Sequence, residues 1–266
     1  MKGALYSTTR PGGRTGQVDD RVDLTVNEVH VRCAWLDRAP AEVDRLHRLL
    51  AEDERERAAR FRFERDRSRY IVGRGLLRLL LAEYVGLAPE QIRFAYGDYQ
   101  KPRLEHDGPW FNLAHSGPVA LFAFSHSGEV GIDVELDHAD FARERIAELY
   151  FSPTEVAVLR SLPETLQARA FLTCWTRKEA FVKARGDGLS LLLASFDVSL
   201  DPSSPPALLR TEWSVDEPTQ WCLRDLSDPE MGYVAALAMR SHGWRVVSRA
   251  VPENLHNVIE TQQEDR

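Results

Sequence analysis

The chain has 266 residues, of which 43% are hydrophobic and 28% charged, and its formal net charge is −7. This balance is typical of a globular protein and argues against nucleic acid as the main partner. No run of about 18 apolar residues is present, so we expect no membrane span. The N-terminus lacks the apolar segment of a secretory signal, which favours a cytoplasmic protein.

In chain order, residues 1–21 lack any hydrophobic periodicity and are expected to be a disordered lead, whereas residues 253–266 are expected to be a flexible tail. The region between them alternates predicted strands and helices. Three cysteines lie far apart with no CxxC motif and are expected to be reduced packing residues: Cys33, Cys174 and Cys222.

The two halves of this region show a similar order of predicted elements about 100 residues apart. In each half a strand precedes a short helix, a long apolar helix that ends at a Gly-Leu pair, and another strand. We therefore expect an α+β fold of two similar subdomains, 22–129 and 130–252, packed as a pseudo-dimer with the active site between them. Chance similarity is the alternative. The matching features are Val29–Asp37 and Val130–Asp137, Ala41–Leu50 and Phe141–Leu149, Tyr70–Tyr84 and Ala168–Ala184, Gly86-Leu87 and Gly188-Leu189, and Phe94 and Phe196.

A stretch rich in arginine lies near residues 55–69 and includes Arg57 and Arg69. Acidic residues interleave with the arginines, which is typical of a solvated helix surface with ion pairs. A local basic patch is the alternative interpretation.

Two carboxylates occur two residues apart in a predicted strand at Val130–Asp137. Strand side chains alternate between faces, so Asp133 and Glu135 point the same way while Ile132 and Val134 point the other way. Two carboxylates on one face can share a hard cation such as Mg²⁺, which prefers oxygen ligands. A polar sheet face with two solvated acids is the alternative.

The predicted helix Ala168–Ala184 carries Trp175, Glu179 and Lys183 on one stripe, four residues apart. The Glu–Lys pair alone is a common surface stabiliser. A tryptophan on the same stripe indicates that this face is covered, so the two charged groups need partners.

A third segment contains Lys101-Pro102 in a predicted loop and a short predicted strand, Trp110–Leu113. This strand leads into a predicted turn, Ala114–Gly117. A histidine before Ser-Gly in such a turn, here His115 before Ser116, could hold a phosphate, helped by exposed backbone N–H groups. A surface histidine with no special role is the alternative.

Together and in this order, these segments resemble the surfactin-type, larger class of 4′-phosphopantetheinyl transferases. The family pattern GxDxE, followed about forty residues later by WxxKExxxK, is matched by Gly131–Glu135 and by Trp175, Lys178, Glu179 and Lys183. Lys101-Pro102 and Phe111–Gly117 match the upstream motifs. The resemblance covers residues 45–240 and implies a fold of two α+β halves with the site between them.

The resemblance implies roles for the matching residues. Asp133, Glu135 and Glu179 are the expected Mg²⁺ ligands, and Lys183 is expected to contact the pyrophosphate of the co-substrate, coenzyme A. Glu155 matches a family acid near the metal whose role stays open. The expected contacts to the nucleotide end and its 3′-phosphate come from Arg57, Arg69, Lys101, Pro102, His115 and Ser116.

The sequence departs from the family pattern at two positions. Ala114 stands where the family often has a hydroxyl residue before the histidine, and Glu54 stands where a basic residue is common. Arg55 is a candidate to replace that basic group. These departures concern phosphate binding and leave the expected reaction unchanged.

The implied reaction is transfer of 4′-phosphopantetheine from coenzyme A to a serine of an acyl or peptidyl carrier protein, with release of 3′,5′-ADP. Charge on the phosphoryl group must be neutralised in the transition state, and Glu179 is expected to accept the serine proton. A monomer is expected, because the repeat supplies both halves of the site.

Two other functions are weighed. A degenerate relative that binds coenzyme A or a carrier without transfer is disfavoured by the intact acids and Lys183. A P-loop enzyme is disfavoured because no GxxxxGK[ST] motif is present.

Overall fold

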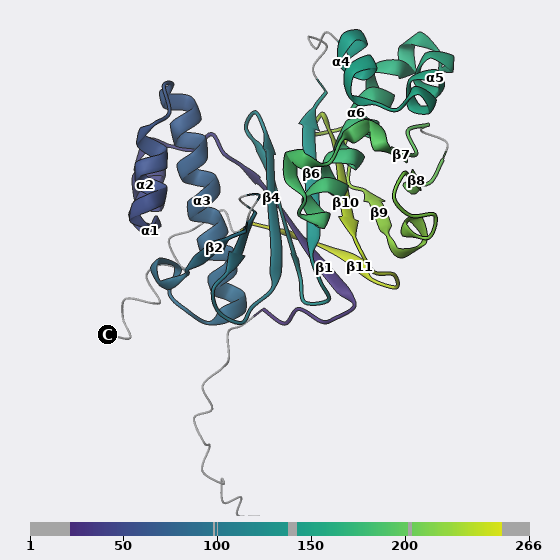
Figure 1. Cartoon of the computed structure of the whole chain (residues 1–266). Coiled ribbons are helices and arrows are strands. Elements are labelled where there is room, and N and C mark those ends of the chain that lie inside the picture. The colour runs from purple at the N-terminus through teal and green to yellow at the C-terminus, as the bar shows by residue number, and fades with distance from the viewer. Residues whose placement is uncertain (1–21, 98, 100, 138–142, 202–203, 252–266) are drawn as a thin grey trace, which may run out of the picture.

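The computed structural model describes residues 22–97, 99, 101–137, 143–201 and 204–251. The predicted disordered lead and flexible tail lie outside these residues. Within the described part, each half of the chain forms a β-sheet with one long helix packed against it (Figure 1).

The first half consists of a strand, three helices, a short hairpin and two further strands. The third helix is much the longest of the three. Its apolar residues come close to surrounding it, and most of them are buried, as in a helix of a protein core. These elements are β1 (Glu28–Trp35), α1 (Pro40–Leu49), α2 (Glu52–Ala59), α3 (Glu64–Val85), β2 (Phe94–Tyr96), β3 (Pro102–Leu104), β4 (Trp110–Ser116) and β5 (Val119–Ser125).

The second half repeats this order of strands and helices and is followed by one additional strand. The predicted internal repeat is therefore confirmed. These elements are β6 (Val130–Leu136), α4 (Arg143–Tyr150), α5 (Pro153–Ser161), α6 (Glu164–Arg185), β7 (Phe196–Val198), β8 (Leu208–Thr211), β9 (Cys222–Asp225), β10 (Tyr233–Met239) and the additional β11 (Arg245–Ala250).

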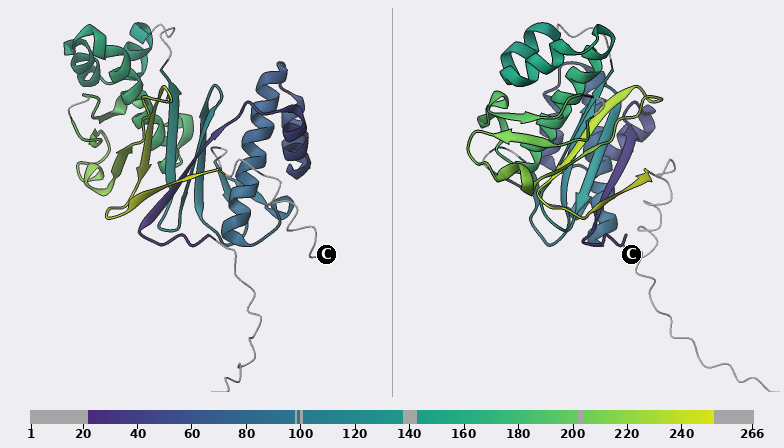
Figure 2. Two further views of the ribbon diagram at one scale, coloured as in Figure 1. Left: turned by 180° about the vertical axis from the view of Figure 1, so that it is seen from behind. Right: turned by 90° about the vertical axis from the view of Figure 1, so that its right-hand side faces the viewer.

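The sheets repeat as well. The first sheet contains the order β1-β5-β4 and the second has the order β6-β10-β9, so in each half the first strand lies beside the last. The hairpins β2-β3 and β7-β8 form two small additional sheets. The additional strand β11 leaves the second half and pairs in parallel with β1, which makes the first sheet four-stranded (Figure 2).

Both long helices end at a glycine in the left-handed conformation, Gly86 with φ 68° and Gly186 with φ 83°. Glycine adopts this conformation without steric cost. The C-terminal end of the predicted helix Ala168–Ala184 is thus confirmed, although the terminating glycine is Gly186 rather than that of the Gly188-Leu189 pair. Gly188 instead begins a short 3₁₀ turn that packs against Tyr99.

The predicted turn at Ala114–Gly117 is also wrong, because β4 continues through His115 to Ser116. Strand β5 provides pairing partners along the whole of β4, up to the pair Ser116 and Val119. The reversal is left to Gly117 and Pro118, and Gly117 has the left-handed φ of 53°.

Side chains rather than backbone pairs connect β4 to β6 across the junction of the halves. The Asn112 Oδ1 accepts a hydrogen bond of 2.8 Å from the backbone N–H of Ile132, and the Ser116 Oγ accepts one of 3.2 Å from the N–H of Leu136. Equal steps of four residues along both strands show that β4 and β6 run parallel here. This parallel run is the seam between the halves.

An apolar cluster fills the space between the two sheets and fixes their relative position. It contains side chains from both halves, so the seam is part of the folded core rather than a surface contact between independent domains. Its fully buried members include Val29, Val119, Val130, Ile132 and Leu237.

Strand β6 also packs directly on helix α6, and a glycine allows this close approach. A Cβ at Gly131 would lie 2.1 Å from the carbonyl oxygen of Ala180 and 2.2 Å from the backbone nitrogen of Ala184. Both are backbone atoms of the helix, so no side-chain movement can relieve such a contact. Any larger residue must push the helix away from the strand.

We therefore expect Gly131→Ala to lower the free energy of unfolding by roughly 1–3 kcal/mol or more, as overpacking of a core does. Urea denaturation followed by circular dichroism measures the loss. Gly97→Ala is the matched control, because a Cβ there meets no atom within 4 Å. Equal stability of the two variants would contradict this account of the β6–α6 contact.

Candidate active site

The three acids predicted as metal ligands lie on the facing surfaces of β6 and α6. Asp133 and Glu135 project from one face of β6, and Glu179 projects from α6. Burial chiefly raises the pKa of Asp133, and the nearby charges of Glu135 and Glu179 add to the effect, so the three carboxylates are close enough to influence one another. The structure thus brings these predicted residues together.

Lys183 lies beside two of these acids, Asp133 and Glu179. Its Nζ donates a hydrogen bond of 2.5 Å to the Oδ1 of Asp133. The Oδ2 of Asp133 is buried and accepts no hydrogen bond from any described residue. On the other side, the Ser116 Oγ donates a bond of 2.8 Å to Glu135.

Burial is the main influence on the acidity of these groups. It raises the pKa of Asp133 to about 7, against the opposing effect of the Lys183 ammonium. Burial also raises the pKa of Glu179, which Lys183 again opposes. Both carboxyls therefore hold a proton at higher pH than ordinary acids, as proton-transfer groups that work near neutrality do.

A cavity of about 530 Å³ opens beside Glu179 and Lys183, which is ordinary for a ligand site. Its wall is mixed: Glu179, Lys183 and Asn112 are polar, whereas one side is formed by aromatic and leucine side chains. The predicted stripe on α6 is confirmed, because Trp175, Glu179 and Lys183 all line the cavity. The apolar side consists of Tyr150, Trp175, Val182, Leu191, Leu192 and Leu193.

A neighbouring, buried face of α6 is fixed by an ion pair. Lys178 lies 2.8 Å from Glu155, and its Nζ also donates to the carbonyl oxygens of Leu193 and Phe196. Glu155 caps the first turn of α5 at Ser152 and accepts a bond from the Val198 N–H. These contacts give Glu155 a structural role and set which face of α6 turns toward the cavity.

The residues expected at the phosphate end fall into two groups. Desolvation, together with the nearby positive charges of Lys183 and Arg69, lowers the pKa of His115. Arg69 forms a bidentate ion pair with Asp37, at 2.7 and 2.8 Å. Arg57 is exposed, with its guanidinium 5.7 Å from the ring centre of Tyr70.

Lys101 lies farther along the seam, beside the beginning of β6. Its Nζ is 2.8 Å from Glu129 and 3.3 Å from the carbonyl oxygen of Ala184. Six residues of strand, roughly 20 Å, separate Glu129 from Glu135. A shared contact of Lys101 and His115 with one end of a ligand therefore stays a prediction.

The sequence departure at Glu54 has a structural explanation. Glu54 is almost fully buried, pairs with Arg74 and Arg78, and accepts a bond from the Ala51 N–H. A basic residue would bring a third positive charge to this buried cluster. If α2 contacts a phosphate, we therefore expect the contact from its exposed arginines, such as Arg57.

Sequence reasoning assigned no role to several residues that the site depends on. Asn112 was noticed only as part of a motif. A single amide side chain within the otherwise apolar predicted strand Trp110–Leu113 is a signal that the sequence does contain. Glu129, Tyr150 and Leu191–Leu193 carry no local pattern that distinguishes them. Only the fold brings them to the cavities.

The donor chemistry of the three acids fits Mg²⁺, and the unpartnered oxygen of Asp133 is available for a cation. Among the described residues, however, no group of three or more His, Cys, Asp or Glu side chains converges closely enough to hold a metal ion. The Asp133–Lys183 pair occupies part of that space. The acids therefore provide the oxygen atoms that Mg²⁺ prefers, but they do not converge on one point, and Mg²⁺ binding stays a prediction.

Comparison with known proteins identifies the class. The profile of the 4′-phosphopantetheinyl transferase superfamily matches residues 129–238, and the profile of the N-terminal part of such transferases matches residues 35–132. The chain belongs to the 4′-phosphopantetheinyl transferase family, as its motifs predicted. The two matches meet where β5 turns into β6.

Among its relatives, the 4′-phosphopantetheinyl transferase HetI of Nostoc sp. is 37% identical over 226 residues, which cover 84% of this chain and 92% of that protein. The 4′-phosphopantetheinyl transferase Sfp of Bacillus subtilis is 33% identical over 169 residues, 62% of this chain and 74% of Sfp. A solved holo-[acyl-carrier-protein] synthase of Thermotoga maritima has a TM-score of 0.33 at 20% identity, covering 43% of this chain and 64% of that one.

If Glu155 is structural, Glu155→Ala should lower the free energy of unfolding by about 3–5 kcal/mol, since Lys178 would be left buried without its carboxylate. Thermal and urea unfolding of the purified variant measure this loss. Glu148→Ala, which removes the exposed partner of Arg160, is the control and should cost under about 1 kcal/mol. Similar losses in the two variants would refute the structural role.

The cations around His115 make a separate prediction. Its pKa should lie below 6.5 in the free protein and should rise in Arg69→Met, because one positive charge that disfavours protonation is removed. Proton NMR of the imidazole across pH 4–9 gives both values. Arg210→Met, which changes an arginine that pairs with Asp197, should leave the His115 titration unchanged.

Proposed function

We propose that the protein transfers the 4′-phosphopantetheine arm of coenzyme A to a serine of an apo acyl or peptidyl carrier protein, releasing 3′,5′-ADP, with Mg²⁺ as cofactor. One observation carries the proposal. Asp133, Glu179 and Lys183 meet where β6 contacts α6, and two of them line a cavity of suitable size. The named activity of HetI and Sfp supports it.

The bond changes are simple. The serine Oγ of the carrier forms a bond to the phosphorus that bears pantetheine, and the bond from that phosphorus to the 3′,5′-ADP oxygen breaks. Glu179 accepts the serine proton, and its raised pKa suits a base that works near neutral pH. The Lys183 ammonium neutralises charge that develops on the leaving phosphate.

Asp133, Glu135 and Glu179 are the residues that would hold Mg²⁺. When bound, the ion supplies positive charge beside the pyrophosphate, which lowers the cost of bringing a nucleophile to an anionic group. Ser116 orients Glu135 through its hydrogen bond. Lys183 compensates part of the negative charge of the acids while no cation is bound.

The shape of the cavity supports a division between the two parts of the substrate. Its apolar side, with Trp175 and Leu193, suits the pantetheine arm, whereas Lys183 suits the phosphates. Arg57, Arg69, Lys101, Pro102, His115 and Ser116 are proposed as contacts for the nucleotide end. No helix of the described residues is long and apolar enough to cross a membrane.

A single chain supplies both halves of the seam, which supports a monomer that binds one coenzyme A. Sedimentation equilibrium measures the state directly. A stable dimer or trimer would contradict the proposal.

Incubation of an apo acyl carrier protein with this protein, coenzyme A and Mg²⁺ should add one phosphopantetheine to the carrier, as seen by intact mass spectrometry. EDTA should abolish the gain. Asp133→Ala and Glu179→Ala should each lower the rate by roughly 10²-fold or more, as expected when a proton-transfer or charge-neutralising group is lost.

Glu148→Gln is the control for this experiment, since Glu148 forms an exposed ion pair with Arg160 and does not line the cavity. Full activity of either alanine variant would remove that residue from the mechanism. Coenzyme A binding with no transfer to several carriers would favour the degenerate binding relative instead.

A further inference from the structure

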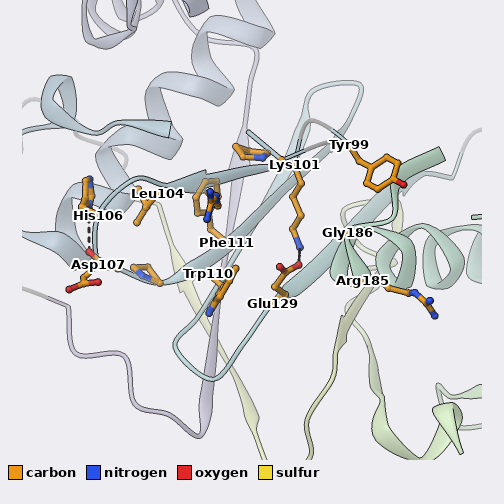
Figure 3. Close-up of a pocket in the computed structure, with 15 residues that line it drawn as sticks. Tyr99, Lys101, Leu104, His106, Asp107, Trp110, Phe111, Glu129, Arg185 and Gly186 are labelled. Atoms are coloured by element: carbon orange, nitrogen blue, oxygen red, sulfur yellow. Dashed lines mark hydrogen bonds and ion pairs between the residues drawn. The ribbon is translucent and has the colours of Figure 1, made fainter. Parts of the chain in front are cut away.

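Two hollows meet at Lys101. The cavity described above lies on one side, and a second hollow of about 380 Å³ lies on the other, lined by Trp110, Phe111 and Glu129 (Figure 3). Lys101, Pro102, Tyr99 and Gly186 belong to the walls of both. The position of the Lys101 side chain therefore determines where one hollow ends and the other begins.

The ammonium group of Lys101, a residue of the first half, is held at two points: one directly before β6, where the halves join, and one on helix α6 of the second half. One is the Glu129 carboxylate at 2.8 Å, and the other is the carbonyl oxygen of Ala184 at 3.3 Å, near the end of α6. Figure 3 shows the extended side chain running from the hairpin to Glu129.

This arrangement has an electrostatic reason. Lys101 is largely enclosed, and its burial lowers the pKa of the ammonium, while the Glu129 carboxylate opposes that effect. A buried ammonium without a counter-charge either loses its proton or moves toward water. Among the described residues, Glu129 forms the ion pair that keeps Lys101 charged at this place.

We propose that Glu129 is a positioning residue for coenzyme A binding: it fixes Lys101 between the two hollows, so that the lysine forms the end wall and a positive contact of the substrate cavity. Glu129 itself does not touch the substrate. The inference rests on the proposed function, in which Lys101 contacts the nucleotide end. Without Glu129, the lysine side chain is free to leave its position and the two hollows join.

The test compares four proteins: wild type, Glu129→Gln, Lys101→Met and the double variant. Titration calorimetry gives the Kd for coenzyme A and for 3′,5′-ADP, and the carrier assay gives KM and kcat. Glu129→Gln should raise Kd and KM for coenzyme A roughly two- to fivefold, in the range of a partly exposed ion pair, with kcat unchanged. In the Lys101→Met background the same change should have no effect.

Two controls separate positioning from general stability. Glu129→Asp keeps the charge and should restore most of the affinity. Glu148→Gln breaks an ion pair of similar exposure elsewhere and should leave KM and Kd at wild-type values. Circular dichroism melting of each variant establishes that the fold is intact, as expected for a side chain that is 42% exposed.

The outcomes are distinct. If Lys101→Met weakens binding but Glu129→Gln does not, or if the Glu129 effect persists without the lysine, the inference is wrong and the proposed function stands. If Glu129→Gln tightens binding, the pair competes with the substrate and positioning is excluded. If the wild-type protein neither binds coenzyme A nor modifies a carrier, the proposed function fails and the inference fails with it.

Discussion

The direct contact of β6 with α6 is the constraint on which the site depends. Because Gly131 has no side chain, the strand approaches the backbone of Ala180 and Ala184 closely. Two residues farther along β6, Asp133 then comes within hydrogen-bonding distance of Lys183. With a wider gap, the acids of the strand and of the helix would each be solvated separately. The close contact places them in one enclosed environment, and this enclosure shifts their acidity.

A second constraint holds the helix in the correct rotation. Lys178 and Glu179 are neighbours in sequence, yet they project from α6 in directions about 100° apart and have different roles. Lys178 is fixed in the core of the second half by Glu155 and two carbonyl oxygens, whereas Glu179 faces the cavity. A motif that looks like one unit in the sequence therefore contains an anchoring residue and a site residue, and the anchor determines where its neighbour points.

Much of this could be predicted from the sequence, and the errors have physical causes. Strand alternation placed Asp133 and Glu135 on one face, and helical spacing placed Trp175, Glu179 and Lys183 on one stripe; the structure agrees with both patterns.

The predicted turn at Ala114–Gly117 was wrong because local turn residues were outweighed by pairing with β5, which only the fold reveals. Glu129 and Leu191–Leu193 gave no local indication, because they reach the cavities through long-range packing. The two halves could be recognised from their spacing, but the return of β11 to the first sheet could not.

The return of β11 is one of two features that make the halves differ. The other is the ion pair between the first strand and the long helix of each half. The counterpart of the Asp133–Lys183 pair, about 100 residues earlier, is Arg32 on β1 and Glu83 on α3, which also form an ion pair, at 2.9 Å. The polarity is reversed: the strand carries the cation and the helix carries the anion. Strand β11 pairs along β1 from Glu28 to Cys33, at the edge that corresponds to the side of β6 facing β4, where only side chains bridge the two strands. The pseudo-twofold arrangement is thus broken twice, by the reversed charges of the strand–helix ion pair and by the additional paired strand β11.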